Sequence, residues 1–176
     1  MIDRVRDVRL EPLDERWTDD VEALIEDSEV LRFTRIPEPP PAGFVRRWLR
    51  SYEAGRRNGT RDGFAATDSA GRFLGLAPAP SIDREAGEIE LGYIVAREVR
   101  GRGAGTAILR VLTRWAFDDI QAQRAYLIID VDNPASRRVA ERAGYRLEGV
   151  MRSIHVKQGR RADAQLWSRL PTDPST

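Results

Sequence analysis

Apolar and polar residues recur along the chain with the periods of strands and helices. Alternation over residues 5–10 predicts a half-exposed first strand. Apolar side chains then recur every three or four residues over 14–26, which predicts an amphipathic helix with an acidic outer face. Four prolines between residues 37 and 41 end any helix there. A second helical stripe, over 42–54, predicts a helix that packs on a neighbouring layer.

The rest of the chain is predicted to alternate strands with two helices. Two hairpins are expected, 63–67 with 72–77 and 82–87 with 88–95, and an amphipathic helix over 106–117. The apolar run 125–131 is typical of a central strand covered on both faces. Asn133 and Pro134 have the order of an N-cap and a first helical residue, and Gly144 suits the end of that helix. Residues 147–156 and 164–170 are expected to close the sheet.

The length of the chain and the order of its elements favour one α+β domain. The 176 residues contain no internal repeat and no interdomain linker. We therefore expect a single domain over 1–170, with a mixed sheet and helices on both faces, followed by a flexible tail over 171–176.

Composition removes several classes of chemistry. The chain has no cysteine, and His155 is its only histidine, so disulfides, thiolate nucleophiles and multi-histidine or cysteine metal sites are excluded. The net charge of +1 gives no general attraction to DNA or to anionic membranes, and no apolar run approaches the length of a membrane span. A cytoplasmic protein with no metal site, no DNA partner and no membrane partner is expected. Residues 1–90 carry a net −5 and residues 91–176 a net +6, which favours the second half for an anionic ligand.

The segment 91–106 carries the clearest functional signal. A strand runs into a loop with Gly101, Gly103 and Gly105, and an amphipathic helix follows. Glycines let a ligand approach the backbone, and the unpaired N–H groups of a helix N-terminus suit a phosphate or pyrophosphate. Arg100 and Arg102 are expected to add mobile positive charge.

Three kinds of anion-binding loop were compared with this segment. A P-loop needs Gly-Lys-Ser/Thr at its end, and the chain has no lysine there. A dinucleotide-binding loop needs a third glycine where the chain has Thr106. The pattern R-x-x-G-x-G is satisfied by Arg100, Gly103 and Gly105.

This pattern resembles the pyrophosphate loop of the GNAT superfamily of acetyl-CoA-dependent N-acetyltransferases. The resemblance extends to N-x-x-S at Asn133 and Ser136, to Gly144-Tyr145 and to Glu148-Gly149, in the family's order. Together with 90–93 and 8–13, these motifs are most similar to the branch that acetylates the N-termini of ribosomal proteins. The resemblance implies a GNAT fold with a mostly antiparallel sheet, splayed where acetyl-CoA binds.

The resemblance also implies which residues contact acetyl-CoA. The end of the family's fourth strand takes the pantetheine arm, the loop takes the pyrophosphate, and the start of the following helix completes the site. The implied residues are Tyr93, Ile94, Val95, Arg100, Gly101, Arg102, Gly103, Ala104, Gly105, Thr106, Asn133, Ser136 and Arg137.

The implied reaction is direct attack of an amine on the acetyl thioester, which agrees with the absence of cysteine. It requires a neutral amine, a donor for the oxyanion and an acid for the departing thiolate. The family supplies the donor from a backbone N–H, here near Val95. Many members use a tyrosine as the acid, but this chain has Ala140 at that position, and Ser136 is the nearest substitute. Ser136 also suits a simpler role, as a first-turn serine bonded to Asp132 or Asn133.

Two residues are candidates for the base. The ordinary pKa of His155, about 6.5, suits proton transfer at neutral pH, and His155 lies where the ribosomal branch has a glutamate. Glu90 is the rival, because strand alternation places it on the face opposite Leu91 and Tyr93. Each also suits a plainer role, His155 as a partly exposed strand residue and Glu90 as a surface carboxylate.

The cost of deprotonation favours an α-amine as acceptor. A lysine amine costs roughly 4 kcal/mol to deprotonate at pH 7.4, whereas an α-amine costs well under about 1 kcal/mol. A protein N-terminus is therefore the first expectation. A small-molecule amine (a polyamine, an amino acid or an aminoglycoside) and a domain that binds acyl-CoA without turnover stay as alternatives, and a homodimer stays open.

Overall fold

The computed structural model describes residues 5, 7–157 and 159–174, and its strands form two sheets. The first sheet has the order β1 (Arg9–Pro12), β2 (Asp62–Thr67), β3 (Phe73–Ala79), β6 (Ile94–Val95). The second has the order β4 (Ser81–Asp83), β5 (Glu88–Glu90), β7 (Arg124–Asp130), β9 (Arg160–Arg169), β8 (Arg146–Lys157). Strands β5 and β7 are parallel, and the other described pairs are antiparallel.

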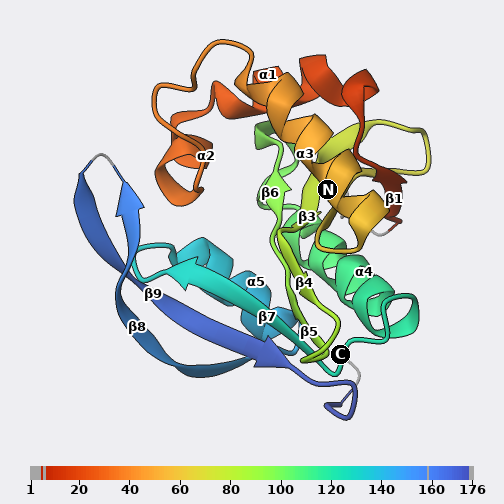
Figure 1. Cartoon of the computed structure of the whole chain (residues 1–176), viewed down its shortest axis with the longest axis vertical. Helices are drawn as coiled ribbons and strands as arrows, with labels where there is room; N and C mark the ends of the chain where they lie inside the picture. The colour runs from red at the N-terminus through yellow and green to blue at the C-terminus, as the bar shows by residue number, and fades with distance from the viewer. Residues whose placement is uncertain (1–4, 6, 158, 175–176) are drawn as a thin grey trace.

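The chain passes between the two sheets at the point where they separate. Leu91 N–H donates to Tyr126 O at 2.8 Å, whereas Gly92 N–H donates to Pro78 O at 2.8 Å. Within one residue the chain therefore leaves β7 and joins the strand on its other side. The prediction of one strand over 88–95 is wrong for this reason, since β5 and β6 belong to different sheets. The divergence of β6 from β7 confirms the predicted splay (Figure 1).

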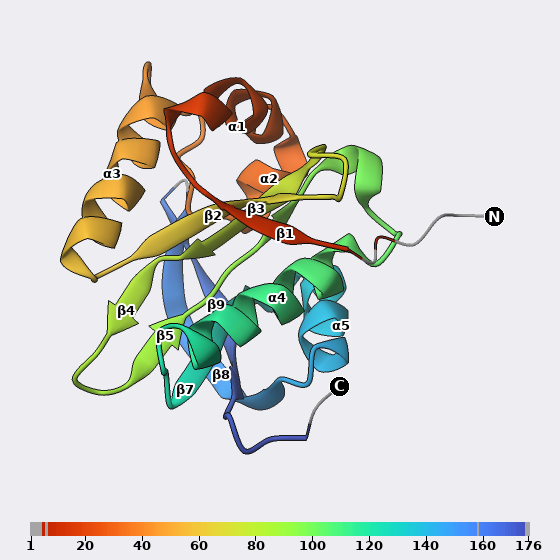
Figure 2. The same cartoon turned by 90° about the vertical axis from the view of Figure 1, so that its right-hand side faces the viewer.

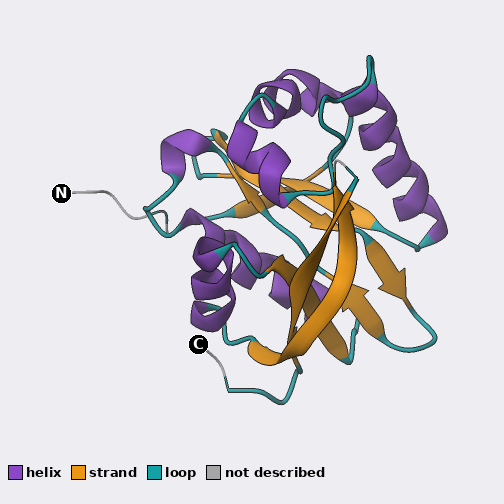
Figure 3. Cartoon of the chain, turned by 90° about the vertical axis from the view of Figure 1, so that its left-hand side faces the viewer, coloured by secondary structure: helices purple, strands orange, loops and turns teal. Residues whose placement is uncertain are grey.

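Helices cover both faces of the first sheet, which confirms the predicted α+β architecture. Figure 2 shows α1 (Thr18–Ile25) and α3 (Phe44–Asn58) above this sheet and α4 (Ala104–Asp118) below it. The remaining helices are α2 (Ser28–Phe33), α5 (Pro134–Arg142) and the 3-10 turns η1 (Glu15–Trp17) and η2 (Arg97–Val99). Figure 3 shows helices around the first sheet, whereas the long strands of the second sheet face the viewer with no helix in front of them.

Helix α4 anchors the core beneath the sheets. Ile108, Leu109 and Leu112 lie on its inner face and are fully buried. Each such side chain contributes roughly 1.5–3 kcal/mol when it leaves water. The start of α4 is thereby held against the strands, and this fixes the loop that precedes it.

Three sequence predictions need correction. The first strand is β1 at residues 9–12 rather than 5–10, because Thr67, opposite Arg9, is the last residue of β2, and residue 6 lies outside the described part. Helix α3 continues to Asn58, where Gly59 ends it in a left-handed conformation (φ 74°). Helix α2 was not predicted at all.

The prediction that the central strand is covered on both faces is also wrong. In β7, Ala125, Leu127 and Ile129 are buried, while the alternate residues Tyr126 and Asp130 are only half-buried. Helices α4 and α5 pack against this strand, and the residues on its other face are only partly covered. This partly covered face is where candidate site residues gather.

Two further observations complete the fold. Among the described residues, no helix is both long and apolar enough to cross a membrane. Asp173 pairs with Arg146 at 3.0 Å, so the chain beyond β9 has an ion pair to β8. Residues 175–176 of the predicted flexible tail lie outside the described residues.

Candidate active site

The glycine-rich loop before α4 presents a row of free backbone donors. Within the described part of the chain, the N–H groups of residues 101–106 have no hydrogen-bond partner. Gly101 and Gly103 have φ values of +74° and +85°, and a Cβ at either position would meet nothing within 4 Å. Free donors, open space and the positive end of a 15-residue helix fit the pyrophosphate that the loop is expected to hold.

Arg100 is not the mobile charge that the sequence predicts. Its Nη1 lies 2.8 Å from Asp27 Oδ2 and 3.2 Å from Glu29 Oε2, and its Nε donates to Val95 O at 3.0 Å. These contacts hold the guanidinium against α2 and the end of β6. Arg102 is exposed and has no ion pair within the part of the chain that the structure describes, so it brings a positive charge to the loop.

Tyr93, Val95, Gly105 and Ser136 meet where α4, α5 and β6 converge. A Cβ on Gly105 would lie 3.4 Å from Val95 Cγ2 and 3.6 Å from the Tyr93 ring. The Tyr93 hydroxyl lies 2.6 Å from Ser136 Oγ and 3.1 Å from Ser136 O. Four of the residues predicted from sequence are therefore brought together at one place.

Ser136 combines a structural bond with one that positions its hydroxyl. Its N–H donates to Asn133 Oδ1 at 3.0 Å, so Asn133 caps α5 as predicted. Its hydroxyl is bonded to Tyr93 rather than to Asp132 or Asn133. Burial raises the pKa of Tyr93 to about 12, and the bond to Ser136 lowers it less. Tyr93 is therefore protonated near neutral pH and can donate to Ser136.

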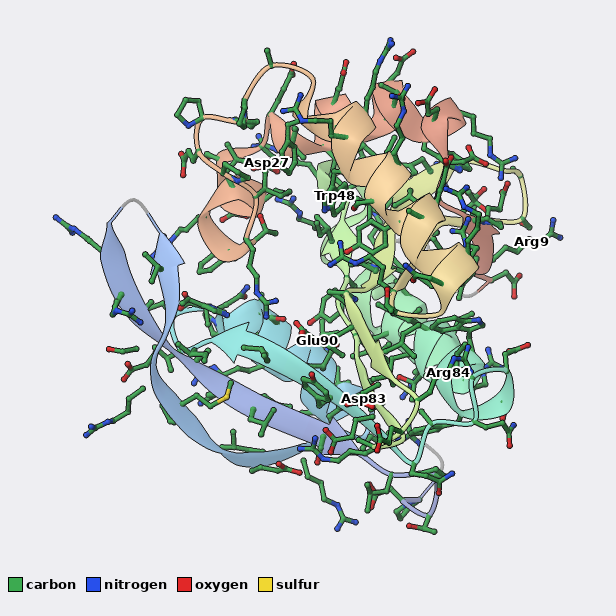
Figure 4. All side chains as sticks on the ribbon, viewed as in Figure 1. Arg9, Asp27, Trp48, Asp83, Arg84 and Glu90 are labelled. Atoms are coloured by element: carbon green, nitrogen blue, oxygen red, sulfur yellow. The ribbon has the colours of Figure 1, made fainter. Side chains whose placement is uncertain are left out.

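The strand register places Glu90, Tyr126, Asp130 and His155 on one face of the second sheet. Glu90 pairs with Tyr126, Asp130 with Ala164 and His155 with Ala162, and residues two apart share a face. We call these four residues the acceptor face. Figure 4 shows Glu90 near the centre of the molecule, where β5 ends.

A bulge in β8 decides that His155 belongs to the acceptor face. Leu147 pairs with Trp167, whereas Gly149 pairs with Leu166, so β8 holds one extra residue at Glu148. Regular alternation from Leu147 would point residue 155 to the side of α5. The extra residue places the following part of β8 in the opposite alternation. A second irregularity, between Met151 and His155, adds two residues to β8 and therefore leaves His155 on the same side as Asp130.

Arg35 brings a positive charge to the acceptor face. It follows α2 by two residues, and its Nη2 donates to Glu90 Oε1 at 2.8 Å. The Glu90 side chain is 13 % exposed and the Arg35 side chain 57 % exposed. One carboxylate oxygen of Glu90 is thus engaged by Arg35.

His155 is held in its neutral form. Its pKa is lowered from the ordinary value, first by burial and then by the charge of Arg35, against the opposing charges of Asp130 and Glu90. Its Nε2 is buried and has no hydrogen-bond partner among the described residues. A neutral imidazole carries a proton on one ring nitrogen and can accept another on the second.

Arg137 lies apart from the other residues predicted to bind the cofactor. It lines a groove with Leu147, Gln165 and Trp167, on the face of the sheet that α5 covers. Ser136 instead contacts Tyr93 on another side of α5. The structure does not bring these two neighbours to the same place.

Four residues of the site were missed by sequence analysis. Asp27, Arg35, Tyr126 and Asp130 owe their places to register and to α2. Asp27 had a usable signal, because it stands as an N-cap residue three positions before the apolar pair Val30-Leu31. Arg35 had none, since it reaches a strand 55 residues away.

Comparison with known proteins identifies the family. The family model described as "Acetyltransferase (GNAT) domain" matches residues 7–146. A Bacillus subtilis protein named "Putative ribosomal N-acetyltransferase YdaF" is 32 % identical over 123 residues, which cover 70 % of this chain and 64 % of that protein. The chain spans less than two thirds of the length of the curated relatives it matches.

Solved structures share the fold at low identity. RimL, a ribosomal L7/L12 α-N-protein acetyltransferase in complex with coenzyme A, has a TM-score of 0.85 at 19 % identity over 96 % of this chain and 97 % of its own. A Vibrio cholerae spermidine N-acetyltransferase with CoA and spermine has a TM-score of 0.82 at 18 % identity over 95 % and 97 %. With the family match over most of its length, the chain belongs to the GNAT acetyltransferase domain family.

Proposed function

We propose that the protein transfers the acetyl group of acetyl-CoA directly to a primary amine, and that a protein N-terminal α-amine is the acceptor. Acetyl-CoA supplies the activated thioester. The observation that carries the proposal is the acceptor face, where His155, whose pKa is lowered by burial and by the charge of Arg35, lies with the Glu90–Arg35 pair.

The cofactor is proposed to lie on the side of α4 and α5. The free N–H groups of 101–106 bind its pyrophosphate, with Arg102 as a nearby cation. The backbone N–H near Val95 polarises the thioester carbonyl. The shape of the site also depends on Tyr93, Ile94, Ala104, Thr106 and Asn133. Arg137 would contact only a part of the cofactor that reaches the groove lined by Arg137. Arg100 acts indirectly, because its Nε donates to Val95 O and so holds the end of β6 in place.

Ser136 and Tyr93 are proposed to stabilise the departing thiolate. The single hydroxyl proton of Tyr93 can go to Ser136 O or to Ser136 Oγ, and when it goes to Oγ the serine proton is free to point at the sulfur. A short bond between two hydroxyls lets each polarise the other. In this role Ser136 takes the place of the tyrosine that many members carry and this chain replaces by Ala140.

His155 is proposed to accept the amine proton, directly or through water. An α-amine near pKa 7.8 is already partly neutral at pH 7.4, so one weak base is enough. Glu90 is the alternative base, but Arg35 engages one of its oxygens. We assign Glu90 to orienting the ammonium group as it arrives.

One observation favours a small-molecule amine as the second candidate. Asp130 has no ion pair among the residues that the structure describes, although it lies on the acceptor face. An uncompensated carboxylate there would attract a second ammonium group, as in a polyamine. A domain that binds acyl-CoA without turnover is the third candidate.

Release of the CoA thiol with a panel of amines separates these candidates. The panel holds a short peptide with a free N-terminus, the same peptide N-terminally blocked but carrying lysine, spermidine and an aminoglycoside. The proposal expects the free peptide to react fastest. Fastest reaction with spermidine or the aminoglycoside would favour the second candidate, and acetyl-CoA binding without thiol release the third.

Labelled acetyl-CoA and a proteome would then identify the natural acceptor. Mass spectrometry should find the label on N-terminal peptides if the first candidate is right. A cytoplasmic location and a homodimer stay predictions. Sedimentation of the purified protein, which measures its mass in solution, tests the homodimer.

A further inference from the structure

Asp27, immediately before α2, carries a buried charge to which the proposed function gives no role. Its side chain is 7 % exposed. Its Oδ1 accepts the N–H of Glu29 at 3.0 Å, which caps the helix. The same carboxylate binds Arg97 Nη2 at 3.1 Å and Arg100 Nη1 at 2.8 Å. A capping residue needs only the first of these bonds, so the two arginines call for a separate explanation.

The two arginines connect Asp27 with the cofactor side of the site. Arg97 is the first residue of η2 and Arg100 follows its last, and this turn leads into the loop with free N–H groups. Arg100 also donates to Val95 O at 3.0 Å, at the end of β6. A continuous set of hydrogen bonds therefore runs from α2 through Asp27 to the loop and to the strand end proposed to polarise the thioester.

The other end of α2 is joined to the acceptor face. Arg35 follows the helix and pairs with Glu90 at 2.8 Å. Between these two connections α2 has six residues and buries only Val30 and Leu31. A helix this short is marginal on its own, so its charged ends largely determine where it lies.

We propose that Asp27 is a positioning residue that couples occupation of the cofactor loop to the placement of α2, and through Arg35 to the acceptor face. The inference rests on the proposed use of acetyl-CoA. A ligand that fixes residues 97–106 also fixes the partners of Asp27, and hence α2. Because coupling between sites is reciprocal, an ordered α2 in turn favours the bound loop.

Hydrogen exchange with coenzyme A as the only ligand tests the coupling without any acceptor. In the wild type, saturating coenzyme A should slow amide exchange both in 101–106 and in α2, by about fivefold or more in α2. Asp27→Asn keeps a side chain that can cap the helix but removes the charge that binds both arginines. In this variant the protection should persist in 101–106 and fall below about twofold in α2.

Asp68→Asn is the matched control. Asp68 caps a turn between β2 and β3 and pairs with Arg72 at 2.9 Å, far from the loop in the sequence and outside both sites. It should leave the protection of α2 unchanged. Equal protection of α2 in wild type and Asp27→Asn would overturn the proposal, as would loss of protection in both variants.

A second variant covers the case in which Asp27→Asn does not fold. Arg97 has a side chain 69 % exposed, and Arg97→Gln removes one partner of Asp27 while the Arg100 pair remains. It should weaken the protection of α2 partially, and full protection would count against the coupling. These results do not depend on which amine is the acceptor, since no acceptor is present. If coenzyme A protected no residue of 101–106, the proposed cofactor site itself would be contradicted.

Discussion

At the scale of single residues, the site depends on where particular protons lie. The loop N–H groups, the Tyr93–Ser136 pair and His155 each offer or accept a proton at a defined atom. Each can be altered by one substitution that leaves the neighbouring atoms in place. Three predictions follow from this.

Gly103→Asp should abolish tight binding of acetyl-CoA. The carboxylate would stand beside the free N–H groups and repel a pyrophosphate, and we expect the affinity to fall roughly 100-fold or more. Gly71→Asp is the matched control, because Gly71 has a similar φ of +78° and equally open space in a distant turn. Calorimetry on both variants measures the effect. Similar affinities in the two would remove the pyrophosphate from this loop.

Ser136→Ala should lower kcat with little change in the affinity for acetyl-CoA. A group that acts on the departing sulfur stabilises the transition state and not the ground state. Tyr93→Phe should lower kcat as well, and the double variant should cost less than the two single effects combined, because the hydroxyls act as a pair. Strict additivity in this cycle would show that the two groups act independently.

His155→Ala should slow the reaction by roughly 100-fold and remove an acidic inflection from the pH profile of kcat/KM. Since the pKa of His155 is lowered, the active neutral form should persist to a pH below the ordinary value of 6.5. Arg35→Gln should move this inflection up, because Arg35 lowers the pKa, and Asp130→Asn should move it down. All variants are compared on one acceptor, so that titration of the amine is common to them. Inflections that do not respond with these opposite signs would return the role of base to Glu90 or to solvent.

More of the residues proposed for the cofactor site than of those on the acceptor face could be named from the sequence. The glycines and the N-x-x-S motif are local patterns, and a local pattern is visible in the sequence. Arg35 and Asp130 join the site only through register and through a contact across the fold, which no short pattern encodes. Arg100 shows the reverse error, because its motif was recognised but its partners in α2 were not.

At the scale of elements, the strongly periodic segments were predicted well and the short ones poorly. Helices α3, α4 and α5 have long apolar faces or clear caps, and the structure confirms them. Helix α2 has six residues and two buried side chains, too few to establish a period. The break between β5 and β6 was also hidden, because apolar alternation continues through Leu91, Tyr93 and Val95 while the hydrogen bonds change sheets.

Different elements contribute the two sides of the proposed site. Loop 101–106, α5 and β6 form its proposed cofactor side, and β5, β7 and β8 carry the acceptor face. Helix α2 is the element that contacts both, through Asp27 at one end and Arg35 just beyond the other. Its small apolar anchor lets its charged contacts control its position.

At the scale of the whole molecule, paired carboxylates should make the protein sensitive to acid. Bonds from Arg97 lower the pKa of Asp27 to about 2, backbone N–H groups lower that of Asp68, and the Ser168 hydroxyl lowers that of Glu148. A carboxyl whose pKa is lower in the folded state stabilises the fold above its ordinary pKa, and this stabilisation is lost as the pH falls toward the folded value. For Asp27 the loss runs from about pH 4 down to about 2.

Asp27→Asn should therefore destabilise the protein most near neutral pH and progressively less below pH 4. Urea unfolding of wild type and variant at pH 6 and pH 3 measures the difference in the free energy of unfolding. We expect that difference to shrink at the lower pH, because the wild-type carboxyl is then losing its charge. A difference that stays constant between the two pH values would mean that the charge of Asp27 adds nothing to folding.

The one-residue bulge at Glu148 has a consequence for comparing this chain with its relatives. Without the bulge, residue 155 would lie on the opposite side of the sheet. A single misplaced gap in an alignment of β8 therefore matches residues of the acceptor face with residues that face α5. Residues at the same distance from the Glu-Gly motif are therefore equivalent only in proteins that share the bulge. In a relative without it, the functional counterpart of His155 belongs at a neighbouring alignment column, and matching by column alone would select a side chain on the wrong side of the strand.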